Sequence, residues 1–599
     1  MSQVARLEIS LTLRSPFMFQ GLANSRLGVD AAFLRDERGR PVIPADQIKG
    51  VLRAACYALA KEAQSIAPAG LLAKLFGRES KSNDAGDPEK YDLPDRGLLI
   101  TGDLSAQADK DVTTTRIEID DETGAVKTGA LQVMELAAPF GAEVEFRGEF
   151  LLQAPNGVDP PAVEKLLSLA INLIPAIGAF KSAGFGEVVA GRVTLKEAAR
   201  VTLATDGTAP ERIAYRVTFD RPLLVDAVRE TDNLFVGSVV VPGAAFKGAL
   251  AAKLALAGVD PERDPEWSTA LANLRISHAF PENDDGRLSR LPLPASLCVY
   301  ADRDDLEFAD GLHEDVGARE FGERWLAPLY PVDWKDEYFD ELSKRARLPH
   351  RAAPSPQPRT HVRIDPGTFV AADQDLFTTV AQGVYRGDGK KRAWRIVVDF
   401  DGVTQGRRAQ LQALIEDGLY AIGRTGACAV FEKIDSACDA ESWGRIRLAM
   451  APAAAPVSGH DDLYALTLIT PALLTDPKEK AKIEEQYKNQ IESQTGGELL
   501  RCYTSRRLAG GYVAMRRRPY GKTYYPFVLT EPGSVFLVRS NAPEKLEHVA
   551  RFGLAPVALK DAKPLDWRNC PYLPENGYGE VAFSLIDPAQ LKEQEGAYV

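Results

Sequence analysis

Two stretches of the sequence place arginines beside aromatic side chains, a combination suited to binding RNA. Residues 344–363 contain Lys344, Arg345, Arg347, Arg351, Arg359 and Arg363, with His361 among them. Residues 501–522 contain Arg501, Arg506, Arg507, Arg516, Arg517, Arg518 and Lys522, interleaved with tyrosines that include Tyr512. Guanidinium groups pair with phosphates, while aromatic rings stack on bases. Both stretches are therefore predicted to contact RNA; the alternative is a solvated charged face.

Two lysine–glycine pairs, Lys49-Gly50 and Lys247-Gly248, lie near the predicted starts of helices. Phosphates favour helix N-termini because free backbone amides and the positive end of the helix dipole lie there. Lys49 and Lys247 are therefore predicted phosphate contacts. The alternative is that each lysine is exposed and serves only solubility.

Glycine-rich turns occur at residues 178–186, 423–426 and 577–579, and two of them contain the cations Lys181 and Arg424. Glycine lets backbone amides approach a phosphate closely because it has no Cβ. The alternative is that these turns allow tight packing of the chain against itself. The GxxxxGK[ST] pattern of P-loops is absent, so nucleotide hydrolysis is not expected.

The overall composition limits the function further. The 599 residues carry 72 Lys and Arg against 84 Asp and Glu, a formal net charge of −12, which argues against a general nucleic-acid coat. No apolar run approaches the ~18 residues of a membrane span, and the N-terminus lacks a signal-peptide pattern, so we expect a cytoplasmic protein. The six cysteines form no CxxC pair, so neither zinc nor disulfides are expected.

The order of predicted elements repeats along the chain. Residues 5–13 alternate apolar and polar like a half-buried strand, and a helix is predicted after Pro44. The same order returns near residue 213, with a helix after Pro242. Aligning the two prolines also matches 98–104 with 274–280, 115–131 with 359–377, 146–152 with 394–400, and 166–191 with 411–434. Landmarks matched in the same order indicate a duplication.

A third, more diverged unit is predicted towards the C-terminus. Residues 463–474 are strand-like, a turn at 532–534 precedes an apolar strand, and 575–586 again combine a glycine-rich turn with a strand. The element order predicts an α+β fold of tandem ferredoxin-like (RRM-like) modules. We expect domains at 1–200, 210–450 and 460–599, with an insertion near 281–358.

Short motifs in these units carry a family resemblance. The first unit contains Asp30, Arg35-Asp36, G-R-P-V-I-P at 39–44, and Lys49-Gly50-Val51-Leu52-Arg53, followed later by Thr115-Arg116-Ile117. These residues resemble the backbone subunit of type III CRISPR effector complexes, a member of the RAMP superfamily. Gly510-Gly511-Tyr512 and Gly533-Ser534-Val535-Phe536 in the third unit resemble the cap subunit that holds the 5′ tag of the guide. Together, the last two units resemble the subunit that occupies the position of the cap subunit in type III-D systems.

The resemblance implies that the chain binds a CRISPR guide RNA, engages complementary target RNA, and assembles with other type III effector subunits. The guide contacts that we expect from the resemblance and the basic segments are Lys49, Arg53, Arg116, Lys181, Lys247, Arg359, His361, Arg363, Arg424, Arg506, Arg507, Tyr512, Arg516, Arg517 and Arg518.

The resemblance also implies a catalytic aspartate. In the resembled backbone subunit, a loop aspartate supports metal-dependent cleavage of target RNA, and Asp30 occupies the matching place. A carboxylate can hold Mg²⁺ or another divalent cation, which polarises the scissile phosphate and helps to activate the 2′-hydroxyl. In the second unit the proline alignment places Val228 opposite Asp30, and Asp226 and Asp232 are the nearby candidates for a second centre.

Each functional expectation has an alternative. Asp30 could instead accept hydrogen bonds from loop amides, as aspartate often does in turns. The chain is accordingly predicted to be a guide-RNA-binding subunit with endoribonuclease activity in its first unit, and a purely structural scaffold is the alternative. A ribonuclease that processes the guide is disfavoured because the six histidines form no general acid–base motif.

Overall fold

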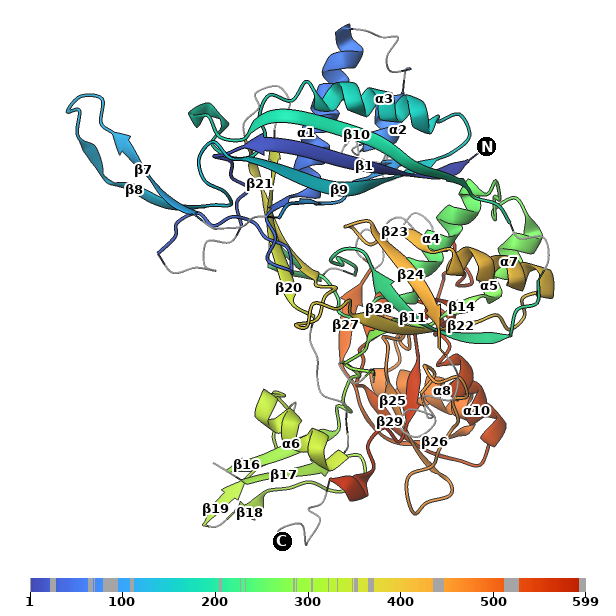
Figure 1. Cartoon of the computed structure of the whole chain (residues 1–599). Helices are drawn as coiled ribbons and strands as arrows, with labels where there is room; N and C mark the ends of the chain where they lie inside the picture. Colours follow the sequence, from blue (N-terminus) through green and yellow to red (C-terminus); the bar gives the residue numbers. More distant parts are fainter. Residues whose placement is uncertain are drawn as a thin grey trace.

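Three α+β units follow one another along the chain, and a small module is inserted into the second (Figure 1). The computed structural model describes residues 2–21, 28–62, 68, 70–78, 95–107, 112–203, 207–226, 228–231, 233–283, 286, 288–302, 305–321, 323–330, 332–346, 348, 354–364, 371–434, 446–510 and 527–591, except the side chains of 95, 371–375 and 590. We call residues 3–200 unit one, 212–434 unit two, 446–591 unit three and 297–346 the inserted module. Among the described residues, no helix is long and apolar enough to cross a membrane.

Unit one is built around a long central strand. Its sheet runs in the order β10 (Glu187–Arg200), β1 (Gln3–Arg14), β9 (Glu143–Ala154), β6 (Leu104–Ser105) and β2 (Val42–Ile43), with β5 (Leu99–Ile100) also beside β9. The pairs are antiparallel. The alternation predicted for residues 5–13 is confirmed, because Leu7, Ile9 and Leu11 are fully buried while their neighbours face the other side of the strand.

Two helices complete the core of unit one. α1 (Ala45–Glu62) and α3 (Pro160–Ile171) bury side chains such as Leu52 and Leu167 in the same cluster as β1. α3 begins where the carboxylate of Asp159 accepts a hydrogen bond from the amide of Ala162 at 3.2 Å. The shorter elements are α2 (Leu71–Phe76), β3 (Gly77–Arg78), β4 (Asp95–Arg96) and the 3-10 turn η3 (Lys181–Ala183).

Unit two repeats this topology. Its sheet runs in the order β14 (Arg275–Ile276), β22 (Ala393–Asp399), β11 (Arg212–Phe219), β24 (Ala427–Lys433) and β23 (Leu419–Ile422), with β15 (Phe280–Pro281) also beside β22. β11 lies between β22 and β24, as β1 lies between β9 and β10. Helices α4 (Gly243–Leu256), α5 (Pro265–Asn273) and α7 (Gln405–Glu416) bury their apolar faces against it. The predicted duplication is therefore confirmed at the level of strand order.

Each of these two units carries a long β-hairpin. In unit one, β7 (Val112–Ile119) and β8 (Val126–Leu136) extend away from the sheet (Figure 1). In unit two, β20 (Pro356–Ile364) and β21 (Ala371–Gln382) form a four-stranded sheet with β12 (Val228–Thr231) and β13 (Leu234–Val236). Arg116 lies opposite Gln132 in the first hairpin, as His361 lies opposite Phe377 in the second. Each hairpin comes directly before the strand that pairs with the central strand of its sheet, β9 or β22, and its first strand ends three residues after Arg116 or His361. The two hairpins therefore occupy equivalent places in their units.

Unit three has the same central arrangement. Its sheet runs in the order β26 (Gly497–Tyr503), β29 (Val535–Ser540), β25 (Leu463–Leu468) and β30 (Val581–Phe583), and α8 (Ile483–Thr495) and α10 (Pro543–Phe552) share its core. A separate hairpin joins β27 (Arg506–Ala509) to β28 (Phe527–Thr530). The 3-10 turns η5 (Pro574–Asn576) and η6 (Pro588–Gln590) flank β30. The predicted α+β class with ferredoxin-like modules is confirmed.

The inserted module has its own small core. It contains the hairpins β16 (Leu297–Asp302)–β17 (Asp305–Asp310) and β18 (Arg319–Phe321)–β19 (Arg324–Leu326), and helix α6 (Asp336–Ala346). Phe308 and Leu342 pack with Ile586 and Leu591 from the end of unit three. The module is therefore anchored to unit three, and it lies at the opposite end of the molecule from unit one (Figure 1).

Candidate nucleic-acid interface

The carboxylate of Asp103 in unit one binds the β20–β21 hairpin of unit two. Asp103 accepts a hydrogen bond from the amide of Ala45 at 2.8 Å and so caps helix α1. The same carboxylate accepts two hydrogen bonds from Arg359 on β20, Nη1 to Oδ1 at 2.9 Å and Nη2 to Oδ2 at 2.5 Å. This bidentate geometry is the strong form of an arginine–carboxylate pair. It fixes the hairpin above the start of α1.

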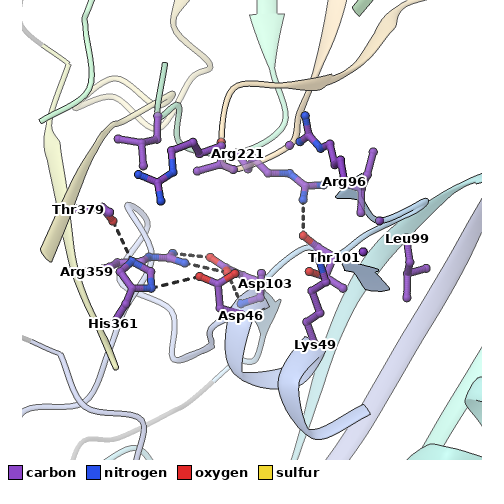
Figure 2. A pocket seen from close by; sticks show the side chains of 18 of the residues that line it. Asp46, Lys49, Arg96, Leu99, Thr101, Asp103, Arg221, Arg359, His361 and Thr379 are labelled. Atoms are coloured by element: carbon purple, nitrogen blue, oxygen red, sulfur yellow. Dashed lines mark hydrogen bonds and ion pairs between the residues drawn. The ribbon is translucent and has the colours of Figure 1, made fainter. Parts of the chain in front are cut away.

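His361 makes the neighbouring contact. Its Nδ1 lies 3.2 Å from Oδ2 of Asp46, and its Nε2 lies 2.8 Å from the hydroxyl of Thr379. The imidazole also stacks on Phe377, with centroids 5.0 Å apart and planes 17° apart. The hydrogen bond from His361 and the nearby charges of Arg359 and Lys49 lower the pKa of Asp46. Figure 2 shows both side chains of β20 directed at the two aspartates of unit one.

Further contacts close the junction between units one and two. Arg96 donates to the carbonyls of Ala421 at 2.6 Å and Gly423 at 3.2 Å. In the reverse direction, Arg221 donates to the carbonyl of Thr101 at 2.7 Å. Glu37 accepts hydrogen bonds from the amides of residues 384 and 385 at 2.9 and 2.8 Å. Both units therefore hold each other through polar contacts around a common space.

That space is a cavity of about 430 Å³ (Figure 2). Its cationic lining residues are Lys49, Arg53, Arg78, Arg96, Arg221, Arg359 and Arg424, and its acidic ones are Asp46 and Asp103. Apolar side chains such as Leu99 and Phe377 complete the wall. Seven cations against two carboxylates leave a clear excess of positive charge. The cavity is therefore suited to an anion with an apolar part.

Burial and the excess of positive charge lower the pKa of two cations in the lining. Burial, together with the charges of Arg96 and Arg53, lowers the pKa of Lys49, although Asp46 opposes the shift. Burial and the neighbouring Arg221 lower the pKa of Arg96. Among the described residues, Lys49 and Arg424 form no ion pair, and Arg424 lies over the ring of Phe235 at 5.7 Å. A bound anion would relieve this mutual repulsion.

The cavity brings together five predicted RNA contacts from distant parts of the sequence: Lys49, Arg53, Arg359, His361 and Arg424. The charged lining residues that the sequence did not predict are Arg78, Arg96, Arg221, Asp46 and Asp103. Asp103 carried a usable signal, because it lies within residues 98–104, one of the landmarks that match between the first two units. Arg96 and Arg221 had no recognisable pattern around them.

Three predicted contacts lie on the hairpins or the turn beside them, outside the cavity. Arg116 on β7 stacks over the ring of Phe180 at 5.1 Å, next to the exposed Lys181. Arg363 is exposed near the tip of β20. Arg116 and Arg363 lie on β7 and β20, so each of the two hairpins carries one predicted contact outside the cavity.

Lys247 requires a correction. It was predicted to contact phosphate, yet only 8% of the residue is exposed, and its Nζ donates to the carbonyl of Leu274 at 2.8 Å. Burial lowers its pKa to about 7. The second turn of α4 faces the core of unit two, so the ammonium is directed inward rather than at a ligand.

The predicted contacts of unit three are only partly described. Arg506 is exposed on β27, and Arg507 lies 3.7 Å from the carboxylate of Asp226. Tyr512, Arg516, Arg517 and Arg518 lie outside the described residues.

Asp30 is exposed at the base of the unit one hairpin. Its Oδ2 accepts a hydrogen bond from the amide of Val133 at 2.7 Å, and its own amide donates to the Val133 carbonyl at 2.8 Å. Oδ1 has no hydrogen-bond partner among the described residues. Magnesium is often bound by one or two carboxylates plus substrate phosphates, so this single oxygen fits a shared metal. The described residues contain no cluster of three or more metal-ligating side chains.

The loop that carries Asp30 is clamped to strand β8. Buried Glu135 accepts hydrogen bonds from the amide of Phe33 at 3.1 Å and from Arg35 at 2.9 Å. The Arg35-Asp36 pair of the family motif therefore has a positioning role, since Asp36 in turn pairs with Arg40 at 2.7 Å. Asp30 is thus held close to the hairpin.

The matching position in unit two is not an acid. Ala31 pairs with Met134 in unit one, and Phe235 pairs in parallel with Thr379 in unit two. The registers of the two hairpins make Met134 equivalent to Thr379, so their partners Ala31 and Phe235 are equivalent too. The residue before each partner is Asp30 in unit one and Leu234 in unit two. The proline alignment, which placed Val228 opposite Asp30, was therefore out of register. Asp226, with a φ of 43°, lies before β12 and faces Arg507 of unit three. Asp232 lies outside the described residues.

The glycine-rich turns serve packing. A Cβ at Gly186 would lie 1.9 Å from the Ile177 carbonyl oxygen, and one at Gly577 would lie 2.6 Å from the amide nitrogen of His278. Both glycines also have positive φ, which other residues rarely adopt. The alternative reading of these turns, close approach of the chain to itself, is therefore the one observed here.

Two segments of the chain match known protein families. Residues 10–189 match the family described as the RAMP superfamily. The chain therefore carries a RAMP-superfamily domain in its first unit. More particularly, residues 333–581 match the CRISPR-associated protein Cas_Cmr3, so a Cmr3-type domain follows in the same polypeptide.

Two solved structures are also similar to it. One is a chain of the type III-B Cmr-beta complex bound to cognate target RNA and AMPPnP, with 14% identity over 54% of this chain and 86% of that one, at a TM-score of 0.28. The other is a chain of Cmr-beta bound to cognate target RNA, with 17% identity over 33% of this chain and 60% of that one, at a TM-score of 0.22. The sequence matches no curated protein.

Proposed function

We propose that the chain is a guide-RNA-binding subunit of a type III CRISPR ribonucleoprotein, with target RNA and other effector subunits as its partners. The observation that supports this most directly is the cation-rich cavity between units one and two. Lys49 and Arg424 form no ion pair among the described residues, and contacts to phosphate contribute a large share of nucleic-acid affinity. The guide strand would cross the junction there.

The two hairpins support a path for the strand beyond the cavity. Ile117 lies opposite Leu131 on the first hairpin, and Val362 lies opposite Leu376 on the second. All four side chains are between 45% and 59% exposed. An exposed apolar pair can pack against unstacked bases. Since the pairs occupy equivalent positions, unit one and unit two would contact the strand in the same way.

Cleavage of target RNA in unit one is the second part of the proposal. Asp30 would share a divalent cation with the scissile phosphate, and that cation would polarise the phosphate and favour ionisation of the 2′-hydroxyl. The Glu135 and Arg35 contacts would hold the Asp30 loop in place during the reaction. Leu234 at the matching position offers no ligand, so unit two would bind RNA without cutting it there.

A purely structural scaffold is the competing function. The hydrogen bond from the Val133 amide to Asp30 favours it, because that contact alone accounts for an aspartate at this position. Cleavage would then be done by another subunit.

Two measurements test the proposal. The chain purified with its partner subunits should retain a discrete small RNA; absence of RNA in every preparation would contradict guide binding. With guide, complementary RNA and Mg²⁺, Asp30→Ala should lose the cleavage product assigned to unit one while keeping its guide. Asp226→Ala, which also removes a hairpin-proximal carboxylate, should leave the products unchanged. An unaltered product pattern for Asp30→Ala would instead favour the structural scaffold.

A further inference from the structure

The inserted module pairs its arginines with aromatic rings and carboxylates. Arg319 lies over the ring of Tyr300 at 4.8 Å and forms an ion pair with Glu307. Arg345 lies over Phe308 at 5.3 Å and pairs with Glu341 at 3.0 Å. A cation between a ring face and a carboxylate gains both cation–π and ionic attraction. The same three-part arrangement thus occurs twice within about 50 residues.

The outer face of the β18–β19 hairpin carries an aromatic ring and carboxylates but no cation among the described residues. Phe321 and Leu326 point inward and pack beside Tyr300. Glu320 and Trp325 form a cross-strand pair and, by the alternation of strand side chains, point the other way. Trp325 is 70% exposed, and Glu320 and Glu323 are exposed beside it. Within the described part of the chain, no cation lies over Trp325 or pairs with either glutamate.

The charge of the module indicates what would supply the missing cation. Residues 297–346 contain fourteen acidic and six basic residues. Arg319, Arg324, Lys344 and Arg345 are all paired with carboxylates inside the module. The outward charge is therefore negative, which repels RNA and attracts basic protein surface.

We propose that this face binds a basic segment of a partner protein, with a lysine or arginine over Trp325 and Glu320 and Glu323 as its counter-charges. Trp offers the best ring for such a contact, and exposed Trp is typical of residues that dominate protein interfaces. The site is separate from the proposed RNA path, because the module lies at the far end of the molecule from unit one (Figure 1). It thus adds a protein-docking surface that guide binding does not require.

A peptide-binding experiment on the full chain tests this. The probe is a fluorescein-labelled peptide of alternating arginine and glycine, followed by fluorescence anisotropy at low salt. Trp325→Ala should weaken binding about fivefold or more, and Trp325→Phe should recover part of it. Glu320→Gln with Glu323→Gln should weaken binding as well, whereas Glu337→Gln with Asp340→Asn on α6 removes the same charge away from the tryptophan and should change it less than twofold.

The outcomes separate docking from simple charge attraction and from RNA binding. Equal losses in the two charge variants, or a Trp325→Ala chain that binds like wild type, would overturn the proposal. A Trp325→Ala chain that loses RNA retention but keeps the peptide would also overturn it, because the face would then belong to the RNA path. Loss of guide binding in Lys49 variants has no bearing on this site, so the two proposals fail independently.

Discussion

Arg359 of unit two and Asp103 of unit one are 256 positions apart in the chain and form a bidentate ion pair over the start of helix α1. The carboxylate that receives the arginine also caps that helix. One side chain therefore sets the position of a hairpin from the next unit and the end of a helix in its own. The cavity with its excess of cations exists because of this junction.

The pair should couple the stabilities of units one and two. Asp103→Asn keeps the cap acceptor but removes the charge, and Arg359→Met removes the guanidinium. A double-mutant cycle on thermal or urea unfolding should give a coupling energy of about 1–3 kcal/mol, since each side chain is only about a quarter exposed. The exposed pair of Arg14 and Glu143 is the control and should give less than about 0.5 kcal/mol. Equal values in the two cycles would mean that Asp103 does not organise the junction.

Lys247 should make the stability of unit two depend on pH. Burial lowers its pKa to about 7 in the folded chain, against about 10.4 when unfolded. Between these values the unfolded state binds more protons, so stability should rise with pH from about 7 to 10, with a slope that approaches 1.4 kcal/mol per pH unit.

Lys247→Met should reduce that slope by up to about 1.4 kcal/mol per pH unit and raise the melting temperature near pH 7. Lys253→Met is the contrast: that lysine forms an ion pair with Asp417 at 2.7 Å, so its removal should lower stability. A Lys247→Met chain that keeps the full slope would show that Lys247 does not titrate in this range. A chain that loses RNA would restore the predicted phosphate contact.

Gly577 should be required for the contact between units two and three. An alanine there would place its Cβ 2.6 Å from the backbone nitrogen of His278 at a φ of +84°. We expect Gly577→Ala to cost about 2–4 kcal/mol, measured as a fall in the melting temperature. Gly459→Ala has the same φ of +84° but nothing within 4 Å, so it should cost only about 1 kcal/mol. Similar losses in both variants would show that strain, not the clash, is the cause.

The sequence predicted the repeated topology well, because alternation in β1 and the matched order of landmarks depend only on local pattern. It predicted both Lys49 and Lys247 as phosphate contacts; Lys49 lines the cavity, whereas Lys247 is buried. The lysine–glycine pair alone does not tell which side of its helix the lysine occupies. The alignment of Asp30 with unit two was wrong because 14 positions separate Asp30 from Pro44, whereas 8 separate Leu234 from Pro242. Arg96 and Arg221 were missed because only the junction gives them a role.

The salt dependence of RNA binding tests most directly whether the cavity between units one and two holds RNA. The Lys49→Gln, Arg424→Gln double variant should bind single-stranded guide-length RNA at least tenfold more weakly. Its slope of log K against log salt concentration should be smaller by about 1.4, because two phosphate contacts are lost. The control is Lys165→Gln, an exposed lysine on α3 outside the cavity, which should leave affinity and slope unchanged. A double variant with wild-type affinity and slope would contradict the claim that this cavity holds the RNA.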